Sequence, residues 1–193
     1  MKYIKLFENF NINSQVIIDS NISLMQALSG ISAPDHILST ITLVNVDYIS
    51  IDKQIHRGQI LIHRDLSRDV EEFFQVLIAS NFIVEKVIPI VKYNWDDNLS
   101  MEDNNSSGFN YRKVEGQKKL SKHSYGKAID INPKWNPVYY SNGKISPSGA
   151  SRDTTRNGVF LPESKGVQFL KSRGWKWGGD WSSLKDWHHF QKD

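Results

Sequence analysis

The chain of 193 residues contains no cysteine. This absence excludes disulfide bonds, thiolate metal sites and a cysteine nucleophile, although it indicates no particular redox compartment. No apolar run approaches the ~18 residues that a membrane-spanning helix needs. The first fifteen residues, MKYIKLFENFNINSQ, contain lysines but neither a continuous apolar segment nor a small-residue cleavage site, so they do not resemble a signal peptide.

Several enzyme motifs are also missing. The chain has no G-x-S-x-G nucleophile elbow, no phosphate-binding loop and no dinucleotide fingerprint. The formal charge of +3 and the pI of about 9.0 give a mildly basic balance. That balance suits a polyanionic surface such as a bacterial cell wall, or a protein with no charged partner, and we expect no nucleic-acid partner.

The clearest regular elements lie in the first half of the chain. Alternating residues from Ile41 to Ile51 predict a strand, and residues 58–63 predict a second one, linked through residues 52–58. Residues 67–80 carry apolar side chains at helical spacing and predict a helix with Ser67 as its N-cap. Residues 20–34 are compatible with a short helix before Pro34.

The second half contains more irregular sequence. We expect an edge strand over residues 84–93, a long polar loop over 96–112, and a short strand over 126–132. Residues 132–158 are interpreted as irregular. Residues 162–174 predict a helix with Pro162 in its first turn and Gly174 as its C-terminal stop.

Strands and helices segregate along the chain instead of alternating. This order predicts the α+β class, with a small antiparallel sheet and packed helices. We expect residues 1–40 to form an N-terminal extension, to which no role is assigned, and residues 41–193 to form the functional domain.

The stretch SKHSYGKAID places His123 and Asp130 seven residues apart, with Gly126 between them. A hydrolytic zinc ion takes three protein ligands from imidazoles and carboxylates and keeps a fourth position for water. A loop and the following strand can supply two such ligands, and Gly126 allows the chain to bend tightly between them. An exposed histidine near a turn, followed by an aspartate at a strand end, is the ordinary alternative.

The stretch DWHHF places Asp186 three residues before His189. An acid and a histidine at this spacing can face the same side of one turn. The histidine can then bind a metal, while the carboxylate accepts a proton from the attacking water as general base. Alone, this pair is a common and unspecific pattern.

Together the two motifs read S-x-H-x-x-G-x-A-x-D followed by D-x-x-H-F. In this order they resemble the M15-type zinc D,D-peptidases, which include D-alanyl-D-alanine carboxypeptidases and L-alanyl-D-glutamate endopeptidases. The family shares its fold with the Hedgehog signalling domain. WGGDW before the second motif, NNSSGFNYR before the first and DINPKWNP after it add to the resemblance, which covers residues 41–191.

The resemblance implies that His123, Asp130 and His189 bind Zn²⁺ and that Asp186 is the general base. His189 fits better than His188, because it stands three residues after Asp186 and directly before phenylalanine. Many relatives carry glutamate at the position of Asp186, although both acids occur. Because the side chain of aspartate is one methylene shorter than that of glutamate, the distance from Asp186 to the reacting water has to be checked in the structure.

Three further residues are candidates for substrate contacts. The family uses an arginine to stabilise the oxyanion, and Arg112 is our candidate, with a surface arginine paired to an acid as the alternative. Ser121 either hydrogen-bonds the substrate or holds its loop. His188 either lines the pocket or is a partly exposed neighbour. Most of the four tryptophans between Trp175 and Trp187 are expected to pack against the sheet.

The leading hypothesis is a monomeric zinc metallopeptidase that hydrolyses a D-amino-acid-containing peptide bond of bacterial peptidoglycan, as a carboxypeptidase or an endopeptidase. It would be synthesised in the cytoplasm and act at the cell wall, as a phage endolysin does, or after removal of a leader. A non-catalytic binding module on the same zinc scaffold and a free D-Ala-D-Ala dipeptidase are the alternatives. Which peptide bond is cut stays open.

Overall fold

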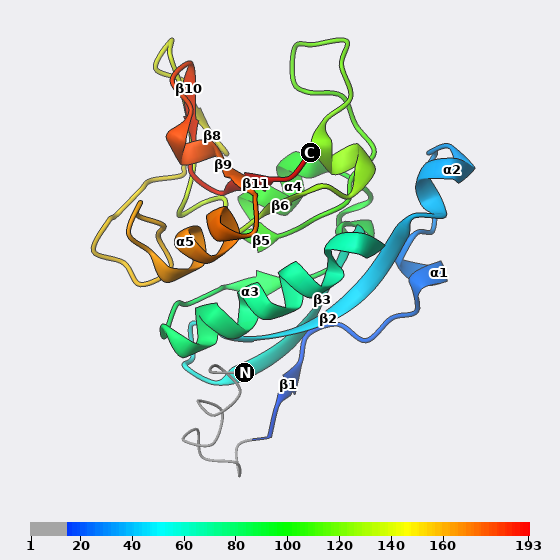
Figure 1. Cartoon of the computed structure of the whole chain (residues 1–193), viewed down its shortest axis with the longest axis horizontal. Helices are drawn as coiled ribbons and strands as arrows, with labels where there is room; N and C mark the ends of the chain where they lie inside the picture. Colours follow the sequence, from blue (N-terminus) through cyan, green and yellow to red (C-terminus); the bar gives the residue numbers. More distant parts are fainter. Residues whose placement is uncertain (1–14) are drawn as a thin grey trace.

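The computed structural model describes residues 15–193. Its longest regular elements follow one another along the chain. β2 (Ile41–Ile49) and β3 (Ile55–His63) pair antiparallel over their whole length. α3 (Ser67–Ala79) follows and packs against β2, as Figure 1 shows. The apolar stripe predicted for this helix is buried, because it faces the sheet.

Two boundaries of these elements differ from the prediction. β3 begins at Ile55, three residues earlier than expected, because the turn closes with a hydrogen bond from the Ser50 N–H to the Gln54 carbonyl. Ser67 is not the N-cap of α3. A 3₁₀ turn (Arg64–Leu66) leads directly into the helix, Leu66 takes the cap position, and the Ser67 hydroxyl donates to the Arg64 carbonyl at 2.8 Å.

The part of residues 15–40 that precedes this hairpin packs against it. β1 (Ile17–Ile18) pairs parallel with β3, which gives a sheet with the order β1-β3-β2. α1 (Leu24–Ala27) begins with a capping box between Ser23 and Gln26, and α2 (Asp35–Leu38) follows. These two helices contribute to a small second core. The division of the chain at residue 40 stays a prediction.

In the middle of the chain, the structure has short elements where we predicted either a longer strand or only a loop. Only β4 (Lys86–Val87) forms within residues 84–93, because the chain turns into a 3₁₀ helix (Ile90–Tyr93) directly after Pro89. The expected loop over residues 96–112 contains α4 (Asp97–Glu102) and β5 (Asn105–Ser106), which pairs parallel with β4. The side chain of Asp96 caps α4 by accepting two backbone N–H bonds.

The remaining strands form two more sheets. β6 (Ala128–Asp130), β9 (Lys176–Trp177) and β11 (His189–Gln191) form a sheet with the order β6-β11-β9. The other sheet has the order β10-β7-β8 and contains the strands not yet named: β7 (Val138–Tyr140), β8 (Ile145–Ser146) and β10 (Leu184–Asp186). Residues 132–158 are therefore not wholly irregular.

α5 (Lys165–Ser172) packs against α3. Pro162 lies before this helix and Ser164 takes the N-cap position, whereas Gly174 ends it in the left-handed conformation, at φ +82°, as predicted. One core joins α3, α5 and the strands β2, β3, β6, β9 and β11. The prediction of the α+β class is confirmed, with four small sheets among the described residues instead of one. No helix among residues 15–193 has the length and apolar character needed to cross a bilayer.

Candidate metal centre

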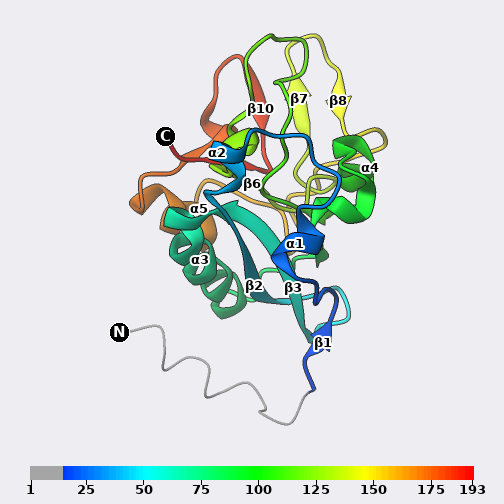
Figure 2. The ribbon, with the colours of Figure 1, turned by 90° about the vertical axis from the view of Figure 1, so that its right-hand side faces the viewer.

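The predicted site residues lie on short elements above the β2–β3 hairpin, in the upper part of Figure 2. Two glycines allow these elements to approach the hairpin. A Cβ at Gly108 would lie 2.1 Å from the Leu61 carbonyl oxygen, and a Cβ at Gly126 would lie 2.5 Å from the His63 nitrogen. Gly126 is also left-handed, at φ +62°, and its carbonyl accepts the His63 N–H at 2.9 Å. These close contacts thus fix the distance between the hairpin and the segments that carry the site residues.

Local hydrogen bonds then orient the first motif. Ser121 caps the 3₁₀ turn Lys122–Tyr125, and its Oγ accepts the backbone N–H of His123 at 3.3 Å. β6 follows and pairs with β11, which places Asp130 directly opposite His189. The two halves of the predicted site meet through this pairing, although 59 residues separate them.

A cleft of about 1040 Å³ opens over these residues. Its walls come from α4, the 112–123 segment, β7, β8 and the stretch between Trp181 and Gln191. Glu115 spans the cleft by accepting hydrogen bonds from Tyr140 Oη at 2.8 Å and from Lys144 Nζ at 2.9 Å. All seven residues predicted for the site line this cleft: Arg112, Ser121, His123, Asp130, Asp186, His188 and His189.

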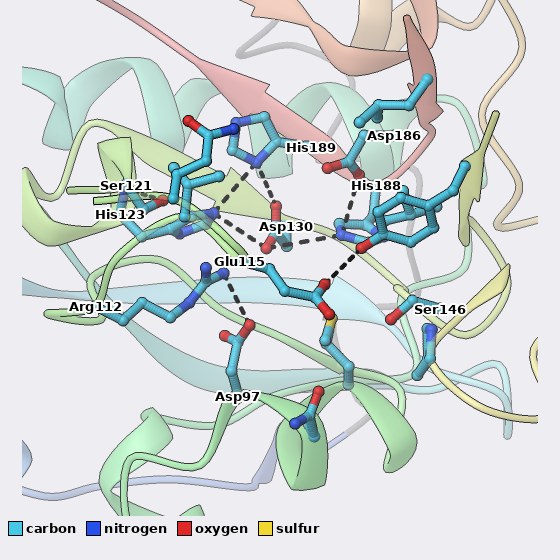
Figure 3. A pocket seen from close by; sticks show the side chains of 18 of the residues that line it. Asp97, Arg112, Glu115, Ser121, His123, Asp130, Ser146, Asp186, His188 and His189 are labelled. Atoms are coloured by element: carbon cyan, nitrogen blue, oxygen red, sulfur yellow. Dashed lines mark hydrogen bonds and ion pairs between the residues drawn. The ribbon is translucent and has the colours of Figure 1, made fainter. Parts of the chain in front are cut away.

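Three buried side chains direct their donor atoms at one point (Figure 3). His123 Nε2 lies 3.1 Å from Asp130 Oδ2 and 3.2 Å from His189 Nδ1, while His189 Nδ1 lies 2.9 Å from Asp130 Oδ1. Tetrahedral coordination with bonds of about 2.0–2.1 Å separates its ligand atoms by about 3.3 Å. The trio therefore fits a metal ion after shifts of a few tenths of an ångström.

The opposite nitrogen of each imidazole also has a partner. His123 Nδ1 lies 2.6 Å from the Gly108 carbonyl oxygen, and His189 Nε2 lies 3.0 Å from Gln191 Oε1. Both partners are oxygens that only accept hydrogen bonds, so both nitrogens carry the proton. The lone pairs of His123 Nε2 and His189 Nδ1 are thereby directed toward Asp130, which is the arrangement that metal-binding histidines require.

Charge reinforces this arrangement. Burial alone would raise the pKa of Asp130, but His123 and His188 hold that pKa well below its ordinary value, so the group is a carboxylate. Burial alone would lower the pKa of His189, but Asp130 raises it to about 9. A proton and a cation thus compete for His189 Nδ1.

Asp186 and His188 form the adjoining part of the cleft. The pattern D-x-x-H bridges the end of β10 and the start of β11 instead of lying on a helical turn. Asp186 Oδ1 is buried and lies 3.1 Å from His188 Nε2, at ion-pair distance, but it accepts no hydrogen bond from the described residues. His188 is 2% exposed and its Nδ1 donates to the Asn136 carbonyl at 2.7 Å, so it is not a partly exposed neighbour.

Arg112 lines the cleft and pairs with an acid, as the alternative description expected, whereas its role toward the oxyanion stays a prediction. Its Nη2 lies 2.8 Å from Asp97 Oδ2 on α4, and its Nε is buried with no hydrogen-bond partner among the described residues. Asp97 was not recognised in the sequence, because α4 was expected to be loop. Ser121 holds its loop through the bond to His123 and is 6% exposed.

Most of the C-terminal tryptophans pack in the core, as expected. Trp175 and Trp177 are buried, and Trp187 packs against Trp177. Trp181 instead lines the cleft, with its ring centroid 5.3 Å from that of His189. Gln191 was also missed, although its position two residues after His189 on one strand places both side chains on the same face.

Comparison with known families agrees with the geometry. Residues 115–192 match the family model of M15 peptidases that is described as D-alanyl-D-alanine carboxypeptidase. Over this part, the chain is similar to the M15 peptidase family, and this similarity implies the fold of the Hedgehog and D,D-peptidase domains. The match includes the metal-site trio and Asp186, whereas Arg112 lies three residues before it. No solved structure matches the chain significantly.

Proposed function

We propose that this protein is a zinc metallopeptidase that hydrolyses a D-amino-acid-containing peptide bond of bacterial peptidoglycan. The observation that carries the proposal is the trio of His123, Asp130 and His189 inside the matched family region. Two imidazoles and one carboxylate also suit ferrous iron. The family match and the peptide-sized cleft favour zinc, which supplies Lewis acidity that polarises a carbonyl group and activates water.

Asp186 is the proposed general base. Its buried Oδ1 accepts no hydrogen bond from the described residues, so it can accept the proton of an attacking water. The Asp186 carboxylate then passes this proton to the leaving amine. His188 Nε2, at 3.1 Å, limits the positions that the carboxylate can take. The backbone at the end of β10 brings the shorter aspartate to the cleft wall, with its side chain 16% exposed.

Arg112 is proposed to stabilise the negative charge that develops on the substrate carbonyl oxygen. Asp97 holds one guanidinium nitrogen, and the buried Nε leaves donor capacity that nothing in the described protein uses. Removing one such donor typically reduces kcat by about 10²–10³-fold. Ser121 and His188 are proposed to line the path of the substrate peptide.

The size of the cleft favours a peptide over a free dipeptide. Its volume of about 1040 Å³ lies at the upper end of the ~300–1000 Å³ range of pockets that enclose drug-sized ligands. Action at the bacterial cell wall follows from this substrate and is part of the proposal.

The decisive experiment combines metal analysis with product analysis. Purified protein is expected to contain one zinc and no iron, and to release peptides from purified sacculi, identified by mass spectrometry of the muropeptides. Asp186→Ala is expected to retain zinc and to lose about 10²–10⁴-fold in rate. Asp180→Ala, which removes an exposed carboxylate paired with Lys171, is the matched control.

Three outcomes would contradict the proposal. Iron instead of zinc would indicate a different chemistry, and zinc without hydrolysis of any sacculus or stem peptide would favour the non-catalytic scaffold. Faster turnover of free D-Ala-D-Ala than of sacculi would favour the dipeptidase. The muropeptide masses also identify the bond that is cut.

A further inference from the structure

We propose that Gln191 is a positioning residue for the metal site, and this inference rests on His189 being a ligand as proposed above. The Gln191 side chain lies on the cleft-facing side of β11, with its Oε1 at 3.0 Å from His189 Nε2. His189 can present the lone pair of Nδ1 to a metal only while Nε2 carries the proton. Gln191 provides the acceptor that holds the proton there.

The orientation of the amide decides whether His189 can act as a ligand. If Gln191 turned its NH₂ group toward Nε2, the proton would have to sit on Nδ1. That nitrogen already faces Asp130 Oδ1 at 2.9 Å and His123 Nε2 at 3.2 Å. The reversed amide would therefore remove His189 from the ligand set.

The two histidines differ in how their protonation is controlled. His123 Nδ1 donates to the backbone carbonyl of Gly108, which no substitution of a side chain removes. His189 depends on a side chain from its own strand, without another hydrogen-bond partner for Nε2 among residues 15–193. A substitution of Gln191 therefore changes the basicity of His189 without replacing any ligand residue.

The test compares Gln191→Met with Gln191→Glu. Methionine has a similar length but offers no strong acceptor, so zinc affinity is expected to fall by about 10–100-fold. Glutamate restores an acceptor and is expected to bind zinc at least as tightly as the wild type. Gln117→Met changes a glutamine at the tip of the exposed 113–120 segment and should leave zinc affinity unchanged.

Zinc affinity is measured by chelator competition, and the proton position of His189 is read from the ¹⁵N shifts of labelled histidine in the zinc-loaded protein. Equal affinity in wild type and Gln191→Met, with the Nε2 proton retained, would overturn the inference. Loss of affinity in both variants would indicate a packing role and would also overturn it. If the wild type itself binds no zinc, the proposed function fails, which is a separate result.

The distribution of charge supports a second, independent inference. Residues 112–127 contain six basic residues and one acid, a net charge of +5, whereas the whole chain carries +3. The rest of the chain therefore has a net charge of −2. Lys113, Lys118 and Lys119 are exposed and form no ion pair with any residue from 15 to 193. Lys113 and Lys119 also line the cleft.

We propose that this basic segment binds carboxylates of the substrate peptide on one side of the scissile bond. The two cleft lysines line the same cleft as the metal-site trio, and this location favours the substrate over a separate polymer. Part of the segment projects as a loop at the top of Figure 1. Free cations there would favour acidic stem peptides over amidated ones.

The test uses one stem peptide in two forms, with free and with amidated side-chain carboxylates. The wild type is expected to prefer the free acid, and Lys113→Gln, Lys118→Gln and Lys119→Gln together should bring the ratio of kcat/KM close to one through a roughly threefold or larger rise in KM. Lys53→Gln, Lys92→Gln and Lys165→Gln together change the net charge equally outside the cleft and should keep the wild-type ratio.

An equal loss on both peptide forms would overturn this inference, as would an equal effect of the control triple. A lower binding of sacculi with an unchanged peptide ratio would assign the lysines to an anionic wall polymer, which also contradicts it. Hydrolysis of either peptide would leave the proposed function standing in each of these cases.

Discussion

The β2–β3 hairpin with α3 and the cleft above it are built differently. The hairpin has two nine-residue strands, and α3 has thirteen residues with six buried side chains. The site rests on strands of two or three residues and on 3₁₀ turns. Apolar burial holds the first region, whereas hydrogen bonds between polar side chains and backbone orient the second. The short elements depend on the long ones for their position.

This difference predicts that the site can be destroyed without loss of the fold. His123→Ala removes a proposed ligand and is expected to lower zinc affinity by more than the ~10–100-fold that loss of a ligand's hydrogen-bond partner costs. Peptide hydrolysis should fall to background while the circular dichroism spectrum of the metal-free protein stays unchanged. His36→Ala, at an exposed position on α2, is the control. Unchanged zinc affinity in His123→Ala would remove the trio as the metal site.

The converse change weakens the scaffold. Phe73 on α3 is fully buried and packs against Phe74, Phe160 and Phe190. Phe73→Ala is expected to lower the free energy of unfolding by about 3–5 kcal/mol, because it leaves a cavity in the core. Urea unfolding with excess chelator measures this loss, and the folded fraction should still bind one zinc. Leu99→Ala, at a half-exposed position, should cost far less.

A third change tests the junction between the two regions. Gly126→Ala places a Cβ at 2.5 Å from the His63 backbone nitrogen, in a left-handed conformation. Gly116→Ala has the same sign of φ, at +71°, but no atom within 4 Å, so it measures the conformational strain of about 1–2 kcal/mol alone. Gly126→Ala should be more destabilising and should also weaken zinc binding. Equal losses in both variants would mean that the close approach to His63 is not required.

The smallest effect is expected at the far end of the hairpin. His56 lies between Asp19, at 2.9 Å, and Asp52, at 3.1 Å. Burial lowers the pKa of His56, but its hydrogen bonds to Asp52 and Asp19 outweigh this and raise the pKa above 6.5. The stabilisation is therefore complete below pH 6.5 and is lost as the pH rises through the raised pKa.

His56→Gln should accordingly be less stable than the wild type by up to about 1 kcal/mol in acid, with a smaller difference in base. Urea unfolding of both proteins at about pH 6 and about pH 9 checks this sign, since the ordinary pKa of histidine lies between those values. A difference that grows with pH would contradict the ion-pair account. His36→Gln serves as the control for a histidine without these partners.

The accuracy of the sequence predictions follows the same division. The hairpin and α3 were predicted almost to their ends, because nine or more residues with period 2 or 3.6 carry a clear signal. α4, β7 and β8 were missed, because elements of two to six residues are too short for periodicity. The expected strand over residues 84–93 was largely wrong, because Pro89 starts a 3₁₀ turn that apolar residues alone do not indicate.

The metal-site residues were recognised as two motifs, since the residue types and their spacing are properties of the sequence. The geometry of these residues could not be predicted from the sequence. The tautomer of His189 depends on Gln191, and that of His123 depends on the Gly108 carbonyl. Neither partner belongs to a motif, and a backbone carbonyl has no residue type to recognise.

The sequence by itself therefore determined the class of the protein, the long scaffold elements and the residue types that can hold a metal. Only the tertiary structure decided that β6 pairs with β11, so that Asp130 lies opposite His189, and that Asp186 Oδ1 is buried with no hydrogen-bond partner among the described residues. The physical reason is distance along the chain. Periodicity and motif spacing are local, whereas a metal site and a cleft form from segments that only the shared core brings together.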